Sequence, residues 1–151
     1  MLHVALWEPE IPPNTGNVAR LCAATGARLH LIGRLGFRLD DRSLRRAGLD
    51  YWHAVDVVRH VTFEDFERAA AGMRIWCVET PNDKPYTRAD FADGDCLLFG
   101  NESSGLPASV RESYADRLVG IPMPTGAVRS LNLATAVGIV LYDALRRLHG
   151  W

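Results

Sequence analysis

The sequence predicts a single α/β domain, with a parallel sheet covered by helices on both faces. Short apolar runs alternate along the chain with stretches of helical character, which is typical of strand–helix–strand units. The length of 151 residues suits one domain with a substantial core. No repeat, low-complexity tract or linker interrupts the chain, so we expect one domain over residues 1–151.

The first third of the chain predicts two strands joined by a helix. Residues 3–7 and residues 28–32 are short apolar runs that suit buried strands. Residues 12–17 hold two prolines and a glycine, which indicates a turn. A helix is expected over residues 18–25, because Gly26 can end it in the left-handed conformation.

The middle of the chain predicts two further strands and two helices. A short helix is expected over residues 38–47 and a strand over residues 55–61. The next helix is expected over residues 62–71, with Thr62 as its N-cap. Residues 74–79 then form another apolar run and predict a strand.

The last third predicts two strands and a long closing helix. The strands are expected at residues 97–99 and 117–121, and the helix over residues 130–149. Apolar side chains from Leu131 to Leu145 occupy almost every direction around the helix axis. Such a helix is buried on all sides, either in a core or against a partner. In a chain this small we expect a subunit interface on this helix.

The composition is ordinary for a globular protein. The chain is 48% hydrophobic and carries a net charge of -1, so its overall charge does not indicate a nucleic-acid partner. Neither a signal peptide nor a membrane span is expected, because polar residues interrupt every long apolar stretch. Widely spaced cysteines in apolar surroundings predict buried thiols in a cytoplasmic protein, without a metal site. These cysteines are Cys22, Cys77 and Cys96.

The most informative segment is the turn that follows the apolar run ending at Phe99. Residues 100–107 read Gly-Asn-Glu-Ser-Ser-Gly-Leu-Pro, and the two glycines allow backbone amides to approach a ligand closely. Glu102 places a carboxylate inside the same turn. Because α/β proteins bind small molecules outside the carboxyl ends of their strands, this turn is a candidate binding site. A purely structural turn is the alternative.

A second motif, Asn-Thr-Gly-Asn-Val-Ala-Arg, occupies residues 14–20. Either Asn14 or Asn17 can cap the helix that follows, and the glycine between them permits a tight turn. Arg20 lies early in the helix, where a positive charge opposes the helix dipole. Arg20 is therefore either a solvated surface residue or a functional one.

A third motif combines Ile-Pro-Met-Pro at residues 121–124 with Arg-Ser-Leu-Asn-Leu-Ala at residues 129–134. Ser130 is a plausible N-cap for the closing helix. Asn132 puts an amide in the first turn of an otherwise apolar helix, and an unpaired buried amide costs roughly 1–3 kcal/mol. Asn132 either ties a loop to the helix or holds a ligand or a neighbouring motif.

Together the three motifs resemble the signatures of the SPOUT superfamily of RNA methyltransferases. More narrowly, residues 7–17 and 44–51 are similar to the bacterial subfamily that methylates the ribose 2′-hydroxyl of the wobble cytidine or uridine in tRNA. The likeness covers nearly the whole chain. Three motifs in the correct order and spacing are far more specific than any one of them.

The resemblance implies a Rossmann-like parallel sheet whose C-terminal part forms a deep trefoil knot, which general topology rules would not predict. It implies S-adenosylmethionine as the cofactor, with S-adenosylhomocysteine as the product and no metal. It also implies a homodimer that acts on tRNA without an appended RNA-binding domain. By position, the residues expected at the cofactor are Val78, Glu79, Thr80, Gly100, Asn101, Gly105, Ile121, Met123, Ser130 and Leu131.

Methyl transfer to a ribose hydroxyl requires the donor and a poor nucleophile to be aligned. Family analogy places Arg20, expected from the partner subunit, at that hydroxyl as the base. A guanidinium keeps its proton, so an equal alternative is that Arg20 anchors a phosphate and orients the hydroxyl while water takes the proton. Asn14 would position Arg20 or the ribose, and Glu102 would pair with Arg20 or Asn14. The residues expected in catalysis are Arg20, Asn14, Glu102, Ser130 and Asn132.

Without an appended domain, the anticodon stem-loop of tRNA must be recognised by the surface of the domain itself. Residues 20–46 include seven arginines and two aspartates, which gives this segment a net charge of +5. Arginines contact phosphates and aromatic side chains stack on unpaired bases, although core packing is the alternative for the aromatic residues. The residues expected to contact tRNA are Arg45, Arg46, Tyr51, Trp52 and Arg129.

Two other functions stay open at this point. The target could be a different tRNA or rRNA nucleotide, because the motifs report the chemistry and not the nucleotide. A non-catalytic RNA-binding module of the same fold is the second alternative, and the joint presence of Arg20, Glu102 and Asn132 argues against it. A Rossmann dehydrogenase is disfavoured, because no Gly-x-Gly-x-x-Gly follows the first strand.

Overall fold

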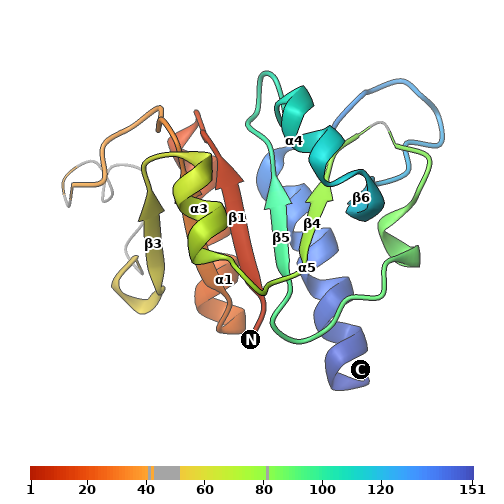
Figure 1. The fold of residues 1–151 in the computed structure, drawn as a ribbon, viewed down its shortest axis with the longest axis horizontal. Coiled ribbons are helices and arrows are strands. Elements are labelled where there is room, and N and C mark those ends of the chain that lie inside the picture. Colours follow the sequence, from red (N-terminus) through yellow and green to blue (C-terminus); the bar gives the residue numbers. More distant parts are fainter. Residues whose placement is uncertain (41, 43–51, 81) are drawn as a thin grey trace.

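The computed structural model describes residues 1–40, 42, 52–80 and 82–151. Six strands lie in this part of the chain: β1 (His3–Trp7), β2 (Arg28–Ile32), β3 (Val57–His60), β4 (Ile75–Val78), β5 (Cys96–Phe99) and β6 (Leu118–Val119). They form one sheet in the order β3-β2-β1-β5-β4-β6, and every described pairing is parallel (Figure 1). The α/β class with a parallel sheet is therefore confirmed.

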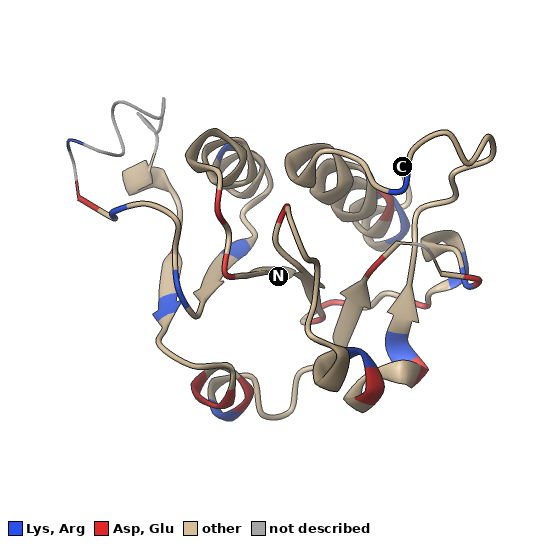
Figure 2. Cartoon of the chain, turned by 90° about the horizontal axis from the view of Figure 1, so that it is seen from above, with Lys and Arg blue, Asp and Glu red and all other residues tan. Residues whose placement is uncertain are grey.

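Helices cover both faces of the sheet. The α-helices are α1 (Pro12–Thr25), α3 (Phe63–Ala69), α4 (Ala108–Ser113) and α5 (Leu133–His149), and the single 3-10 turns are η1 (Trp52–Ala54), η2 (Tyr86–Arg88) and η3 (Ala115–Arg117). Helices α1 and α5 lie on one face, and α3 and α4 lie on the other (Figures 1 and 2). The sheet is thus the middle of three layers.

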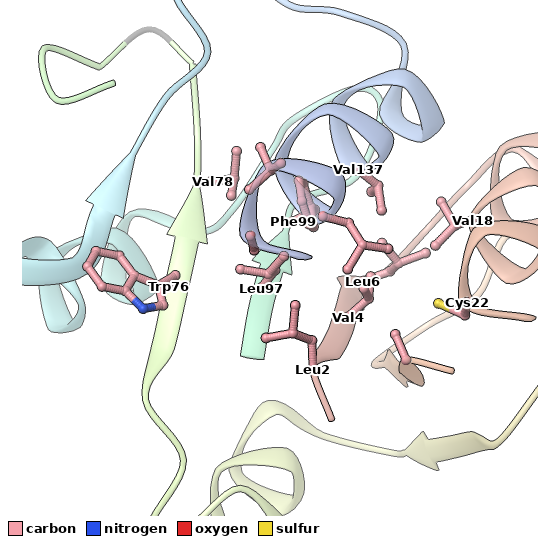
Figure 3. Packing of buried hydrophobic residues seen from close by; sticks show 14 of the residues in the cluster. Leu2, Val4, Leu6, Val18, Cys22, Trp76, Val78, Leu97, Phe99 and Val137 are labelled. Carbon is pink, nitrogen blue, oxygen red and sulfur yellow. The ribbon is translucent and has the colours of Figure 1, made fainter. Parts of the chain in front are cut away.

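The larger part of the core lies between the sheet and the pair α1 and α5. Side chains alternate across a strand, so Val4 and Leu6 of β1 enter this layer while Ala5 faces the other side. Figure 3 shows these β1 residues meeting Val18 of α1 and Val137 of α5. Fully burying an aliphatic side chain of this size contributes about 1.5–3 kcal/mol, so this layer fixes both helices on the sheet.

Helix α1 begins at Pro12, six residues before the predicted start at Val18. The prediction of a turn over residues 12–17 was wrong, because proline is well suited to the first helical position. Its φ angle is already helical, and the missing N–H is one that a first turn leaves unpaired. The helix ends as predicted, with Gly26 in the left-handed conformation at φ 76°.

Helix α5 begins at Leu133 and is capped by Asn132, so the prediction of Ser130 as its N-cap was wrong. The Oδ1 atom of Asn132 accepts a hydrogen bond from the Thr135 N–H at 3.2 Å. One side of the helix is fully buried, whereas Tyr142 is 41% exposed. Burial on every side is therefore not achieved within one copy of the chain, and a covering partner stays a prediction.

The remaining predictions differ from the structure mainly at the ends of elements. The strands expected at residues 55–61, 74–79 and 117–121 are β3, β4 and β6, each shorter than predicted. Thr62 is confirmed as the N-cap of α3, because its side chain accepts the Asp65 N–H. Helix α4 was not predicted. Most of the helix expected over residues 38–47 lies outside the described residues.

Two expectations about composition can be compared with the described residues. Cys22, Cys77 and Cys96 are buried and make no disulfide, and burial raises the pKa of Cys22 and Cys77 to about 12. In the described part of the chain, no helix is both long and apolar enough to cross a membrane.

Candidate functional site

The candidate site lies at the edge of the sheet where the strands end. The loops that leave β1, β4, β5 and β6 gather there, together with the start of α5 (Figure 1). This edge includes a switch point, because the neighbouring strands β1 and β5 lead to helices on opposite faces of the sheet, α1 and α4 (Figure 1). Open α/β sheets bind their ligands at such a switch point. A cavity of about 340 Å³ occupies the edge, within the size range of small-molecule sites.

The cavity collects residues from distant parts of the chain. All ten residues that the sequence analysis placed at the cofactor line it, and so do Asn14, Glu102 and Asn132. Among the described residues, those lining the cavity include no lysine and no arginine. Four further lining residues were not predicted. They are apolar, lie in or beside the motifs and resemble ordinary core positions: Ile11, Phe99, Leu133 and Ala136.

The turn after β5 is closed by its own residues. The Asn101 side-chain oxygen accepts hydrogen bonds from the Ser104 N–H at 2.9 Å and the Ser104 hydroxyl at 2.8 Å. A Cβ atom at Gly100 would overlap the backbone of Gly105 and Leu106. Gly105 also has a φ of +68°, which disfavours any other residue. Both glycines are therefore required to fold the turn, and both still line the cavity.

Glu79 places a half-buried carboxylate in the wall of the cavity. Its Oε2 atom accepts the Leu106 N–H at 2.7 Å, which ties the end of β4 to the turn after β5. Burial raises the pKa of Glu79, while the Leu106 hydrogen bond and the charge of Arg111 partly oppose that shift. A carboxylate held in this way favours a ligand that carries positive charge on that side.

The Glu102 carboxylate accepts hydrogen bonds from backbone amides at the start of α1. Its Oε1 atom accepts the Glu10 N–H at 3.0 Å, and its Oε2 atom accepts the Ile11 N–H at 2.8 Å. The first turn of a helix leaves amide hydrogens unpaired and favours negative charge. The prediction that Asn14 or Asn17 caps this helix was wrong, since Ile11 is at the N-cap and the capping carboxylate comes from the turn after β5.

Asn14 and Asn132 extend this arrangement into a network that joins the three motifs. The Asn14 Nδ2 atom donates to Glu102 Oε2 at 3.1 Å, and its Oδ1 atom accepts from Asn132 Nδ2 at 2.9 Å. Of the two pairings expected for Glu102, that with Asn14 is confirmed. Asn132 both caps its own helix and holds a neighbouring motif. Asn132 is exposed, so the burial expected for its amide was wrong, although both ends of the amide are paired.

Arg20 lies beside the cavity and does not line it. It is exposed on α1, at a second hollow of about 430 Å³ between α1 and α5. Asn132 lines both spaces and separates them. The other residues of this second hollow are Asn17, Leu21, Ala24, Ala134 and Thr135.

The residues expected to contact tRNA have different outcomes. Trp52 is half-buried in η1 and packs against the core on the α1 side, which favours the core-packing interpretation. Arg129 is exposed and lines neither space, whereas the next residue, Ser130, lines the cavity. Arg45, Arg46 and Tyr51 lie outside the described residues. Over the ranges that the structure describes, no group of three or more His, Cys, Asp or Glu side chains is arranged to hold a metal.

Comparison with known proteins agrees with this geometry. A family model described as the SpoU rRNA Methylase family matches residues 1–142. The tRNA (cytidine(34)-2′-O)-methyltransferase of Escherichia coli (strain K12) is 46% identical over 149 residues, which cover 98% of this chain and 94% of that protein. The corresponding enzyme of Aeromonas hydrophila subsp. hydrophila is 48% identical, over 98% of this chain and 95% of that protein.

Solved structures give the same result. One described as "Structural insights into the 2-OH methylation of C/U34 on tRNA" superposes with a TM-score of 0.93 and 49% identity, covering 100% of this chain and 98% of that one. The SpoU methyltransferase AviRb from Streptomyces viridochromogenes, in complex with AdoMet, superposes with a TM-score of 0.80 and 31% identity, covering 97% of this chain and 57% of that one. On the family match, the sequence identities and the shared fold, the chain belongs to the SpoU rRNA methylase family.

Proposed function

We propose that this protein transfers a methyl group from S-adenosylmethionine to the ribose 2′-hydroxyl of the wobble nucleotide, cytidine or modified uridine, of tRNA. The observation that carries the proposal is the single cavity at the edge of the sheet, where the ten expected cofactor residues meet the Glu102–Asn14–Asn132 network. The relatives named for methylation at position 34 match nearly the full length of the chain and supply the nucleotide.

The cavity suits S-adenosylmethionine in its charge and its walls. Among the described lining residues there is no lysine or arginine, so a phosphorylated nucleotide would find no cationic side chain in the cavity. Glu79 and Glu102 instead favour a cationic ligand, and Val78, Ile121 and Leu131 offer apolar walls to a flat base. When bound, the cofactor supplies an electrophilic methyl group on a positively charged sulfur.

The acceptor side of the reaction is assigned to Arg20. Its position at the second hollow, with Asn132 between it and the cavity, would place an acceptor ribose next to the methyl donor. Because a guanidinium keeps its proton at ordinary pH, we assign Arg20 to orienting the hydroxyl and a neighbouring phosphate, while water accepts the proton. Asn14 and Asn132 keep the wall between the two spaces in place.

A second copy of the chain is proposed to complete the site. The hollow beside Arg20 is bordered by Leu21 and Ala24 of α1 and by Ala134 of α5. Gly138 and Tyr142 continue the α5 face at intervals of four residues. An apolar helix face of this kind is suited to pairing with its own copy about a two-fold axis. Arg20 would then act on ribose bound beside the partner's cofactor.

We propose recognition of the anticodon stem-loop by the domain's own surface, in a protein of the cytoplasm. Arg34, Arg38 and Arg42 are the described members of the arginine-rich segment that follows β2, and all three are exposed. The segment leaves the same edge of the sheet as the cavity (Figure 1). Its guanidinium groups would bind backbone phosphates and position the wobble ribose.

We also propose that the C-terminal part of the chain forms the deep trefoil knot. Gly120, just after β6, donates its N–H to the Lys84 carbonyl and accepts the Tyr86 N–H, each at 2.9 Å. From α5, the Arg147 guanidinium donates to the carbonyls of Thr87, at 2.8 Å, and Ala89. Residues 84–89 are therefore held between β6 and α5, as expected where a C-terminal segment passes through the preceding loop.

The test is transfer of labelled methyl from S-adenosylmethionine to undermodified bacterial tRNA, with the label mapped to a nucleotide. Label on the ribose at position 34 supports the proposal. Label at another nucleotide of tRNA or rRNA would keep the chemistry and overturn the assigned target. Cofactor binding without any transfer to competent tRNA would favour a non-catalytic RNA-binding module.

A further inference from the structure

Glu10 is an exposed acidic residue between β1 and α1 that does not line the cavity. Its side chain nevertheless has defined partners. The Oε1 atom accepts hydrogen bonds from the Ser103 N–H at 2.9 Å and from the Ser103 hydroxyl at 2.6 Å. These bonds lower the pKa of Glu10, so the side chain stays ionised at neutral pH. The catalytic scheme above leaves this carboxylate without a role.

The contact is one half of a reciprocal arrangement. Ser103 belongs to the turn after β5, and its neighbour Glu102 accepts the N–H groups of Glu10 and Ile11 in the other direction. Each of the two loops thus offers one carboxylate to backbone amides of the other. Hydrogen bonds to an ionised acceptor are shorter and stronger than neutral ones. Four such bonds join segments that lie more than 90 residues apart in the sequence.

The two loops have different tasks at the candidate site. The turn over residues 100–105 carries Gly100, Asn101 and Gly105 in the cavity wall, while the loop before α1 leads to Asn14 and Arg20. Asn101 closes the turn from within through Ser104. Glu10 holds the same turn from the loop before α1 through Ser103, so the turn is fixed to a second segment of the chain.

We propose that Glu10 is a positioning residue for methyl transfer, which holds the cofactor-facing turn against the loop that leads to the acceptor-side helix. The inference rests on the proposed function. Glu10 acts through Ser103, and the same contact keeps Glu102 within reach of Asn14. Loss of the Glu10 carboxylate therefore loosens the wall of the cofactor cavity and displaces Glu102 from the start of α1.

The test compares Glu10→Ala, Glu10→Gln and a matched control, Glu67→Ala. Glu67 is an exposed carboxylate on the opposite face of the sheet that accepts the Tyr114 hydroxyl at 2.7 Å. The measurements are the dissociation constant of S-adenosylmethionine, the single-turnover rate with tRNA and the Tm. We expect Glu10→Ala to weaken cofactor binding roughly tenfold and to slow transfer at saturating cofactor. Glu10→Gln should recover most of both, because its amide oxygen can accept the same hydrogen bonds.

Glu67→Ala should leave cofactor affinity and transfer rate unchanged even if its Tm falls. Ser103→Ala removes one of the two Glu10 contacts, so its effect should be smaller and should disappear in the Glu10→Ala background. The proposal is overturned if Glu10→Ala and Glu67→Ala behave alike, or if Glu10→Ala lowers only the Tm. If the unmodified protein binds no S-adenosylmethionine, it is the proposed function that fails.

Discussion

At the scale of single residues, the site depends on side chains that both donate and accept hydrogen bonds. Asn14 is 7% exposed, and its amide donates to Glu102 with one end and accepts from Asn132 with the other. An amide is required because the two neighbours need opposite partners: a carboxylate needs a donor and an amide NH₂ needs an acceptor. This explains why residues from three distant motifs meet at one point.

Asn14→Asp tests this requirement. The variant places a second carboxylate beside Glu102 and removes the donor, so we expect it to lower the free energy of unfolding by roughly 2 kcal/mol. Asn17→Asp is the matched control, because Asn17 is exposed in the same helix, and its effect should stay within about 0.5 kcal/mol. Urea unfolding measures both. Equal destabilisation by the two variants would contradict the network.

Arg20→Ala tests the division of the site into a cofactor side and an acceptor side. Arg20 lines the second hollow and not the cavity, so the variant should abolish methyl transfer while S-adenosylmethionine affinity changes less than about twofold. Calorimetry and a transfer assay separate the two effects, with Arg68→Ala on α3 as a control for loss of an exposed arginine. A collapse of cofactor binding would instead make Arg20 a structural residue.

At the scale of elements, the sequence predicted what periodic apolar patterns can show. Strands β4 and β5 are buried along their whole length, and continuous apolar runs of this kind are typical of central parallel strands. Helix α4 was missed because only Val110 is buried in its six residues, so it has no apolar periodicity. The early start of α1 was missed because two successive prolines usually indicate a turn, although proline also suits the first helical position.

Some features of the candidate site could likewise be predicted from the sequence and others could not. Ten residues that line the cavity could be predicted, because the family resemblance gives their positions in the sequence. The contact between Asn14 and Asn132 could not, because 118 residues separate them and only the folded sheet brings them together. Glu10 gave no signal either, since one exposed acid before a helix is ordinary.

Three neighbouring strands also share a row of buried histidines on the α3 side of the sheet. His3, His30 and His60 come from β1, β2 and β3, and their facing ring nitrogens are 2.9 Å apart at both contacts. His30 and His60 stack at a centroid distance of 5.2 Å, and both rings meet the edge of Phe66. A shared N–H between two ring nitrogens requires at least one neutral imidazole at each contact.

This row predicts loss of stability in acid. Burial, helped by the neighbouring imidazoles, lowers the pKa of His30 from 6.5 to about 4, and burial also lowers the pKa of His3 and His60. Between these two pKa values of His30, the unfolded chain binds more protons than the folded protein. The free energy of unfolding is therefore highest above about pH 7 and decreases as the pH falls toward 4. For His30 alone, the loss at pH 5 is on the order of 2 kcal/mol.

Urea unfolding measured at a series of pH values from about 4.5 to about 7.5 checks this expectation. His30→Gln should reduce the dependence of unfolding free energy on pH, whereas His53→Gln, at an exposed histidine, should leave it unchanged. If the free energy of unfolding depends on pH equally in the unmodified protein and in His30→Gln, the histidine row is not the cause of the loss of stability in acid.

At the scale of the whole molecule, the fold places two spaces on either side of Asn132 and leaves a face of α5 only partly covered. The proposed second copy on this face would explain why the closing helix is apolar in nearly every direction. It would also explain why Arg20 lies outside the cavity, since the acceptor side of one copy would then face the cofactor of the other. Assembly and catalysis are therefore expected to fail together.

Ala134→Glu tests this dependence. Ala134 borders the second hollow, so a carboxylate there should be unfavourable between two copies while a single folded copy accommodates it. We expect a monomer by sedimentation and a loss of methyl transfer of more than about a hundredfold. Glu64→Lys, on α3 at the opposite face, should remain a dimer with full activity. A fully active Ala134→Glu monomer would contradict the shared site.

Two anticodon stem-loops that differ by one oxygen atom test the proposed methyl acceptor directly. One carries ribose at position 34, and the other carries 2′-deoxyribose there, with every other 2′-hydroxyl retained. We expect stoichiometric methyl transfer from S-adenosylmethionine to the first stem-loop and none to the second, although both stem-loops bind the protein. Equal methylation of the two substrates would show that the acceptor is not the wobble 2′-hydroxyl.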